Sequence, residues 1–323
     1  MLQDDFGRKF EYLRLSITDL CNFRCNYCLP DGPDCNSGKD NMSLKEIATL
    51  VSAFAKLGTK KIRITGGEPA LRKDLEEVIR ICADTPGIQQ VGLTTNGFNL
   101  DKKIESWHQA GLTNLNVSAD SLDPRLFNTI TGHDKLERVL AGVDKALELG
   151  MDKVKLNAVL LNAFNYHQFD RYLEWLRSKP VTVRFIELME TGDNKEFFKQ
   201  NHVSGEELKQ SLLERGWTQV IKDKLAGPAQ EFFHCDYEGR IGLIMPYSKD
   251  FCQSCNRLRV SSNGQLHLCL FAEQGIDLRA QLLTQDVEQV CDTLVASMSN
   301  KVVSHELQQH FTGATKHLAS LGG

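Results

Sequence analysis

Strand and helix patterns alternate through the first 200 residues, and this alternation limits the possible folds more than any other feature. Six short segments alternate apolar and polar residues, which predicts strands at 12–18, 61–65, 90–95, 114–119, 153–160 and 182–189. Helical periodicity in the intervening segments predicts helices at 43–58, 72–83, 101–110, 134–149 and 166–178. Such alternation is typical of βαβ units with a parallel sheet. Because a closed (β/α)8 barrel needs more repeats, we expect an α/β fold with an incomplete (β/α)6 barrel.

One face of these predicted strands is polar. Parallel strands that are covered on both faces usually read as near-continuous apolar runs. Here apolar and polar residues alternate, and the polar positions include the cations Arg14, Arg63 and Lys155. Isolated cations in a packed barrel centre would be strongly unfavourable. We therefore expect a wide, wet lumen that holds an anionic ligand; the alternative is a sheet with one solvated face.

The pattern changes after about residue 200, where a predicted helix at 204–216 is followed by short strand patterns. These strands are expected in "TQVI", "EFFHC", "RIGLIMP", "RLRVSS" and "QLHLCL". Two further helices are predicted near 276–283 and 286–298. We therefore expect two domains, a partial barrel at 1–200 and a C-terminal α+β extension at 201–323.

The composition is that of an ordinary globular protein, with 41% hydrophobic and 25% charged residues. No apolar run approaches the roughly 20 residues of a membrane span, and the charged N-terminus is unlike a signal peptide. We therefore expect a cytoplasmic protein without a membrane contact. The net charge of −4 argues against a nucleic-acid surface, so a phosphate ligand would need a local cluster of cations.

Ten cysteines are many for such a chain, and six of them form two groups of three. Disulfides are disfavoured in the cytosol, so metal ligation or catalysis is the leading interpretation. The first group, "CNFRCNYC", places Cys21, Cys25 and Cys28 within eight residues. A structural zinc ion usually draws on four ligands. Three thiolates from one short loop suit three irons of a 4Fe–4S cluster and leave its fourth iron free.

The first cysteine group resembles the motif of the radical S-adenosylmethionine enzymes. "TGGEP" at 65–69, directly after a predicted strand, resembles the second motif of that family. The resemblance implies that S-adenosylmethionine chelates the free iron. Gly66 and Gly67 would allow close approach of the backbone to this ligand, and Glu68 would receive its ammonium group.

The second group contains Cys252, Cys255 and Cys269, again with three thiols. It could form a zinc site or a closed cluster, completed by Cys235 or His267. We favour a second open cluster whose free iron meets the substrate. Arg257 and Arg259 follow on one strand face, where two guanidinium groups would suit phosphates.

Both groups together, with "RITGGEP", "NVSADSLD", "FCQSCNRLR" and the terminal "LGG", resemble the GTP 3′,8-cyclase family of molybdenum cofactor biosynthesis over almost the whole chain. The resemblance implies two 4Fe–4S clusters, one on Cys21, Cys25 and Cys28 and one on Cys252, Cys255 and Cys269. It implies S-adenosylmethionine contacts at Tyr27, Gly67, Ser118 and Met189. It also implies GTP contacts at Arg14, Arg63, Thr94, Lys155, Arg257, Leu258 and Arg259. The loop with Cys35 departs from the family's pattern.

The resemblance further implies the reaction and the partners. A 5′-deoxyadenosyl radical would take hydrogen from C3′ of GTP, and the ribose radical would attack C8 of the guanine. An electron-donor protein would act upstream and cyclic pyranopterin monophosphate synthase downstream, by product hand-off. The chain would be a monomer or homodimer, and its Gly322–Gly323 tail would insert toward GTP. Two rival hypotheses are a peptide-modifying radical enzyme with an auxiliary cluster and a non-catalytic, zinc-stabilised binding module.

Overall fold

The structure is a computed structural model that describes residues 1–29, 40–151, 153–221 and 225–313. The predictions about the loop with Cys35 and about the tail at Gly322–Gly323 lie outside the described residues. Within the described ranges, no helix combines the length and the apolar character needed to cross a bilayer.

A single twelve-stranded sheet runs through the described chain in the order β12-β11-β10-β1-β2-β3-β4-β5-β6-β9-β8-β7. The first six strands are β1 (Tyr12–Ser16), β2 (Lys61–Thr65), β3 (Gln90–Thr95), β4 (Asn114–Ser118), β5 (Lys153–Leu160) and β6 (Thr182–Glu187). The others are β7 (Thr218–Gln219), β8 (Gln230–Phe233), β9 (Arg240–Ile244), β10 (Arg257–Val260), β11 (Gln265–His267) and β12 (Ile276–Asp277). All neighbours from β10 to β9 pair in parallel, and the outer strands pair antiparallel.

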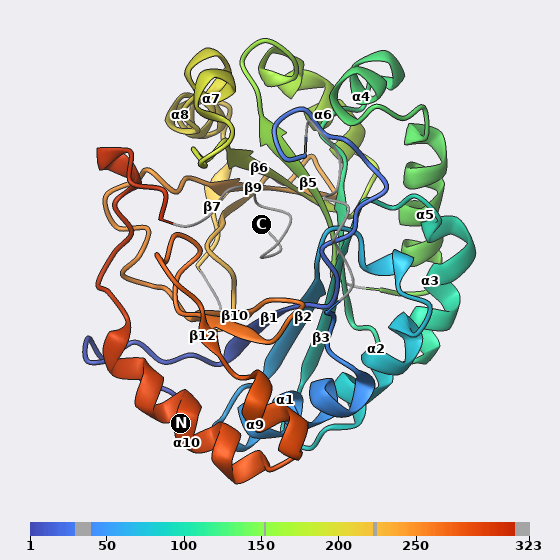
Figure 1. Cartoon of the computed structure of the whole chain (residues 1–323). Coiled ribbons are helices and arrows are strands. Elements are labelled where there is room, and N and C mark those ends of the chain that lie inside the picture. The colour runs from blue at the N-terminus through green and yellow to red at the C-terminus, as the bar shows by residue number, and fades with distance from the viewer. Residues whose placement is uncertain (30–39, 152, 222–224, 314–323) are drawn as a thin grey trace.

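Helices follow the first six strands, as the alternating pattern predicts. They are α1 (Leu44–Lys56), α2 (Leu75–Asp84), α3 (Leu100–Gln109), α4 (Pro124–Thr131), α5 (Leu136–Glu148), α6 (Phe169–Leu176) and α7 (Lys195–Asn201). Helical periodicity did not predict α4 and α7, because helices of only 8 and 7 residues show little periodicity. Three helices come later, α8 (Glu206–Glu214), α9 (Arg279–Thr284) and α10 (Val287–Ser297). Figure 1 shows the sheet curving around a central space with α1 to α6 on its outside.

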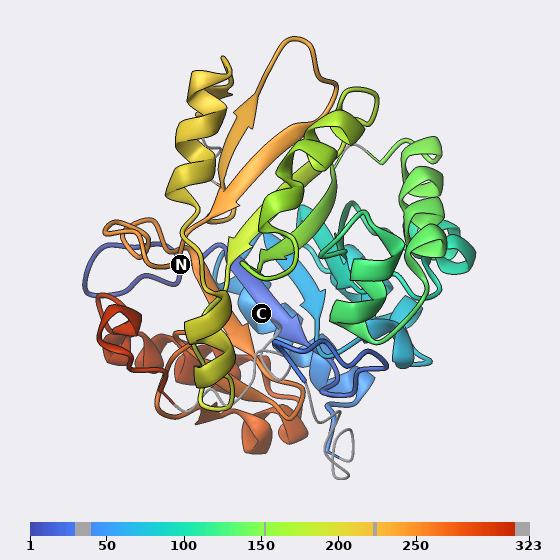
Figure 2. The ribbon, with the colours of Figure 1, turned by 90° about the horizontal axis from the view of Figure 1, so that it is seen from above.

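The C-terminal region extends the same sheet at both edges instead of forming a sheet of its own. β10 pairs with β1, and β9 pairs with β6. Figure 2 shows the β8–β9 hairpin (light orange) projecting on one side of the molecule beside α8 (yellow). The sheet thus joins the two predicted domains, whose division at residue 200 stays a prediction.

The polar strand face predicted from the sequence turns toward the inside of the curved sheet. On the opposite face, apolar residues such as Leu15, Ile64 and Val117 are fully buried in the core beneath the helices. The register places Arg14 beside Arg63 on one side and beside Arg259 on the other. Because parallel strands align their side chains in rows, these cations form one continuous wall. The polar face therefore lines a cavity, as expected, whereas the anionic ligand stays a prediction.

Candidate active site

The first cysteine group lies in the loop after β1, which aromatic packing fixes to the core. Phe23, between the first two cysteines, is 2% exposed and stacks on His133 with 4.6 Å between ring centroids. His133 Nε2 in turn lies 2.8 Å from the carbonyl oxygen of Asn22. Phe23 also meets the rings of Phe98 and Phe127 edge to face. The loop therefore has a defined shape, and Phe23 anchors it to the core.

The GGEP loop after β2 packs directly against the chain that leads into the first cysteine group. A Cβ atom on Gly67 would lie 2.2 Å from the carbonyl oxygen of Leu20, so only glycine fits. Glu68 is buried, and its carboxylate accepts hydrogen bonds from Ala70 N, Thr95 Oγ1 and Asn96 N. These bonds hold the loop itself. Contact of Glu68 with a ligand ammonium group stays a prediction.

A cavity at the carboxyl ends of β2 to β6, the first cavity, contains the first cysteine group. Its lining includes Cys21, Cys25, Cys28 and all four positions predicted to contact S-adenosylmethionine, which are Tyr27, Gly67, Ser118 and Met189. Tyr27 donates a hydrogen bond of 3.0 Å to Asp120, and Asp120 also accepts from Val159 N at 2.8 Å. Burial raises the pKa of Asp120 to about 6. The first cavity therefore combines thiols with a buried carboxylate.

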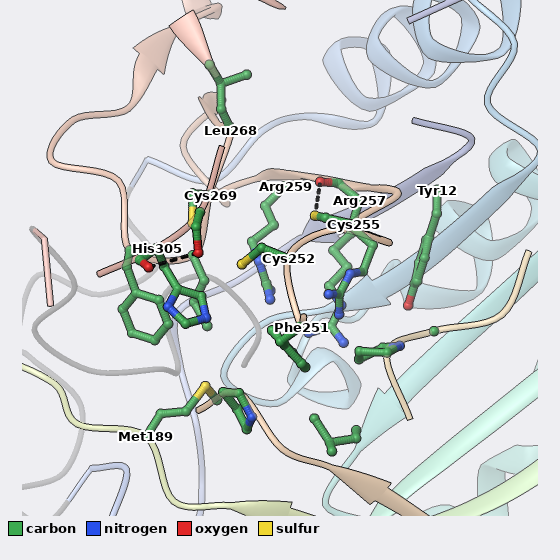
Figure 3. Close-up of a pocket in the computed structure, with 18 of the residues that line it drawn as sticks. Tyr12, Met189, Phe251, Cys252, Cys255, Arg257, Arg259, Leu268, Cys269 and His305 are labelled. Carbon is green, nitrogen blue, oxygen red and sulfur yellow. Dashed lines mark hydrogen bonds between the residues drawn. The ribbon is translucent and has the colours of Figure 1, made fainter. Parts of the chain in front are cut away.

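A second cavity contains the second cysteine group, with Cys252, Cys255 and Cys269 in its wall (Figure 3). Five of the positions predicted to contact GTP line it as well: Arg14, Arg63, Thr94, Arg257 and Arg259. Arg257 and Arg259 occupy alternate positions of β10, which places both guanidinium groups on the same face. Burial lowers the pKa of both arginines. This cationic wall is suited to a polyanion.

The other two predicted GTP contacts lie elsewhere. The side chain of Leu258 is 1% exposed and packs in the core on the apolar face of β10, so Leu258 is not part of the lining of the second cavity. Lys155 lines a third cavity, which it shares with Lys61, Arg63 and Arg184. There Lys155 Nζ lies 3.0 Å from Glu231 on β8.

The structure adds residues that the sequence analysis did not select. Arg184, in the middle of β6, is 6% exposed and lines both the second and the third cavity. The alternation of apolar and polar residues along β6 could have identified Arg184, because its neighbours Val183 and Phe185 lie on the apolar face. Tyr12 lies in the same wall, and although burial raises its pKa, Arg63, Arg14 and other nearby cations lower it to about 6.

The spacing of the thiols tests which metal group would fit. A tetrahedral zinc ion with Zn–S bonds of about 2.3 Å brings its sulfurs to within about 3.8 Å of one another. Among the described residues, only one group of three His, Cys, Asp or Glu side chains has all its ligand atoms within 4.8 Å of one another. It consists of His234, Cys235 and Asp236. Both cysteine groups are therefore more widely spread, which fits a larger cluster better than a single zinc ion.

The remaining cysteines differ in their surroundings. Cys82 and Cys291 are buried in the core, as expected for small hydrophobic side chains. Cys235 is exposed after β8 and is not part of the lining of the second cavity, so the structure does not support it as a spare ligand. His267 packs beside Arg259 in the ladder of β10 and β11 and is likewise absent from that lining.

Comparisons with known proteins agree with this geometry. The model of the Radical SAM superfamily matches residues 15–176, and the model described as Molybdenum Cofactor Synthesis C matches residues 181–307. The solved structure of SuiB from Streptococcus suis, bound to S-adenosylmethionine, covers 90% of this chain and 68% of its own, with a TM-score of 0.62 at 14% identity. HydG, a maturase of the [FeFe]-hydrogenase, gives a TM-score of 0.51 at 17% identity, over 63% of this chain and 48% of its own. At these identities the similarity concerns the fold alone.

Curated relatives resemble the chain along its whole length. The GTP 3′,8-cyclase of Psychromonas ingrahamii is 55% identical over 100% of this chain and 95% of the relative. The GTP 3′,8-cyclase of Shewanella denitrificans is 53% identical over 100% of this chain and 96% of the relative. That of Vibrio parahaemolyticus is 51% identical over 99% of this chain and 97% of the relative. The chain has two groups of three cysteines, one of them beside a cationic wall, and it is similar to these relatives over both regions. It therefore belongs to the GTP 3′,8-cyclase family of the radical SAM superfamily.

Proposed function

We propose that the chain cyclises GTP to (8S)-3′,8-cyclo-7,8-dihydroguanosine 5′-triphosphate, the first step of molybdopterin biosynthesis, with S-adenosylmethionine as the radical source. One observation carries the link from structure to reaction. The first and second cavities share four lining residues: Thr94, Asn157, Ile186 and Met189. A cofactor in the first cavity and a nucleotide in the second would therefore meet across this common wall, where hydrogen transfer needs contact.

The first cavity is the proposed cofactor site. Cys21, Cys25 and Cys28 would hold a 4Fe–4S cluster, which supplies the electron that cleaves S-adenosylmethionine. Tyr27, Gly67, Ser118 and Met189 would contact that ligand. The negative charge of Asp120 behind Tyr27 favours a cationic ligand. The chain's own part is to fix the ligand and to exclude water.

The second and third cavities form the proposed GTP site. Nε of Arg63 and Nε of Arg184 are buried and have no hydrogen-bond partner among the described residues. Buried donors without a partner are costly, so a bound anion would relieve them. Arg14, Arg63 and Lys155 would hold phosphates from the sheet, and the segment Arg257–Arg259 would contact the nucleotide from β10. Thr94, in the shared wall, would touch it near the cofactor.

The C-terminal region would supply the second cofactor. Cys252, Cys255 and Cys269 would hold a second 4Fe–4S cluster, which would supply a Lewis-acidic iron in the second cavity. In this proposal residues 1–200 are the incomplete (β/α)6 barrel and residues 201–323 the auxiliary-cluster and GTP-binding region. The wide thiol spacing supports clusters over the zinc-stabilised module. The electron donor, the hand-off to cyclic pyranopterin monophosphate synthase and the monomer or homodimer state remain predictions.

The test is anaerobic turnover of the reconstituted protein with S-adenosylmethionine, dithionite and GTP deuterated at C3′. We expect the cyclised nucleotide and 5′-deoxyadenosine that carries the deuterium, both detected by mass spectrometry. Cys25→Ala should give neither product. Formation of 5′-deoxyadenosine without deuterium, and without a cyclised nucleotide, would contradict the proposal.

A further inference from the structure

The segment from Lys301 to His305 lines the second cavity. Lys301 Nζ donates a hydrogen bond to the carbonyl oxygen of Leu268, immediately before Cys269. Lys301 is buried, and its segment is thereby tied to the second cysteine group.

Arg8 ties the same segment to the other half of that group. Its guanidinium donates to the carbonyl oxygens of Val302 at 2.7 Å, Val303 at 2.6 Å and Cys252 at 3.1 Å. Asp4 accepts from Arg8 Nε at 2.6 Å, and the two side chains are only 0% and 8% exposed. A buried guanidinium with several fixed acceptors is a rigid connection. The segment is therefore held in place beside Cys252.

His305 ends this segment with its imidazole inside the cavity wall. Its ring lies 5.9 Å from that of Phe251 and 5.7 Å from that of Phe271, centroid to centroid. Nδ1 accepts a hydrogen bond from Leu307 N at 3.4 Å, which leaves the proton of the neutral ring on Nε2. Nε2 is buried and has no hydrogen-bond partner among the described residues. Figure 3 shows His305 at the cavity that contains Cys252 and Cys269.

We propose that His305 donates a hydrogen bond from Nε2–H to the sulfur of Cys252 when that thiolate is bound to iron, and thereby raises the reduction potential of the second cluster. The inference rests on the second cluster proposed above. Hydrogen bonds to cluster sulfurs stabilise the reduced, more negative state. His305 is a positioning residue, because it acts through the cysteine and needs no contact with the substrate.

The test compares His305→Leu and His305→Gln with the wild type in the reconstituted protein. An EPR-monitored redox titration should show a more negative midpoint potential for the second cluster in His305→Leu, because the donor is lost. His305→Gln keeps an N–H donor and should restore part of the shift. In resonance Raman spectra, the change of the Fe–S(Cys) stretch in D2O should be present in the wild type and smaller in His305→Leu.

Two controls test whether the effect is specific to the second cluster. The first cluster should keep its potential in every variant. His310→Leu, at an exposed position beyond this segment and outside the lining of the second cavity, should leave both potentials unchanged. An unchanged second potential in His305→Leu at full iron content would overturn the inference. If His305→Leu and His305→Gln both lose half of the iron, the ring packing and not the donor is what matters, which also overturns it. Wild-type protein with one cluster would instead refute the underlying two-cluster proposal.

Discussion

The two cysteine groups have the same number of thiols but opposite electrostatic surroundings. Burial raises the pKa of Cys25 well above its usual value, and the nearby Asp120 adds to the effect. In the second group, burial also raises the pKa of Cys255, but Arg257 and Lys301 lower it to a net value below the usual one. The first cavity thus favours a ligand with positive charge and the second a ligand with negative charge. A sulfonium cofactor and a triphosphate satisfy this difference.

The largest effect should come from removing each group separately. Replacing Cys21, Cys25 and Cys28 with Ala should remove about half of the roughly eight irons per chain, because one of two clusters loses its ligands. S-adenosylmethionine cleavage should stop, whereas GTP binding should persist. Replacing Cys252, Cys255 and Cys269 should also remove about half of the iron but should leave some cleavage of S-adenosylmethionine without cyclisation. Iron analysis and 5′-deoxyadenosine assays measure both. If either triple variant keeps the wild-type iron content, the two-cluster comparison fails.

A single cation of the third cavity should have the next largest effect. A charged hydrogen bond contributes about 1.5–3 kcal/mol, so Lys155→Ala should weaken GTP binding about 10–100-fold. S-adenosylmethionine binding should change little, because Lys155 is not part of the first cavity. Calorimetry with each ligand measures this. Lys145→Ala, at a more exposed position paired with Glu105, is the control and should bind both ligands normally. Equal loss of both ligands in Lys155→Ala would indicate a folding defect and contradict the assignment.

The pH dependence of GTP binding should distinguish the cationic site further. Burial lowers the pKa of Lys61 to about 8 and that of Lys155 to about 8. Each lysine binds phosphate in its protonated form, so affinity is full below this pKa and declines as the pH rises through about 8. Between pH 7 and pH 9 the protonated fraction of a lysine with a pKa of about 8 falls about tenfold, so each lysine that must be protonated should raise the Kd for GTP about tenfold over this range. Lys155→Gln should flatten the profile. A Kd for GTP that is independent of pH across this range would show that the phosphates do not contact Lys61 and Lys155.

Sequence patterns predicted the sheet and most of the site because both depend on local signals. Period-2 alternation identified the wall with Arg14 and Arg63, and the cysteine spacings identified both groups. Arg184 was not selected, although the same alternation places it on the polar face. What sequence could not predict depends on long-range pairing: β9 and β10 join opposite edges of one sheet, and Arg8 reaches Cys252 across 244 residues of chain. No local pattern encodes such contacts, because they arise only when the sheet has curved.

The smallest effect we predict comes from the hydrogen bond behind the first cysteine group. Tyr27 donates to Asp120 Oδ2 at 3.0 Å inside the first cavity, and Val159 N donates to Oδ1 at 2.8 Å. Since burial raises the pKa of Asp120 to about 6, its carboxylate is charged at pH 7.5, and Tyr27→Phe removes one of its donors. A hydrogen bond to a charged group contributes about 1.5–3 kcal/mol. Because this bond would act on the cofactor only through Asp120, we expect a loss of about 1 kcal/mol, which corresponds to roughly fivefold weaker binding of S-adenosylmethionine. GTP binding should stay unchanged. Tyr166→Phe, which removes the donor to the exposed Glu207, is the matched control and should affect neither ligand. If Tyr27→Phe weakens the binding of GTP as much as the binding of S-adenosylmethionine, then the hydroxyl acts through the wall that the two cavities share. In that case the two cavities differ less in ligand preference than their charges suggest.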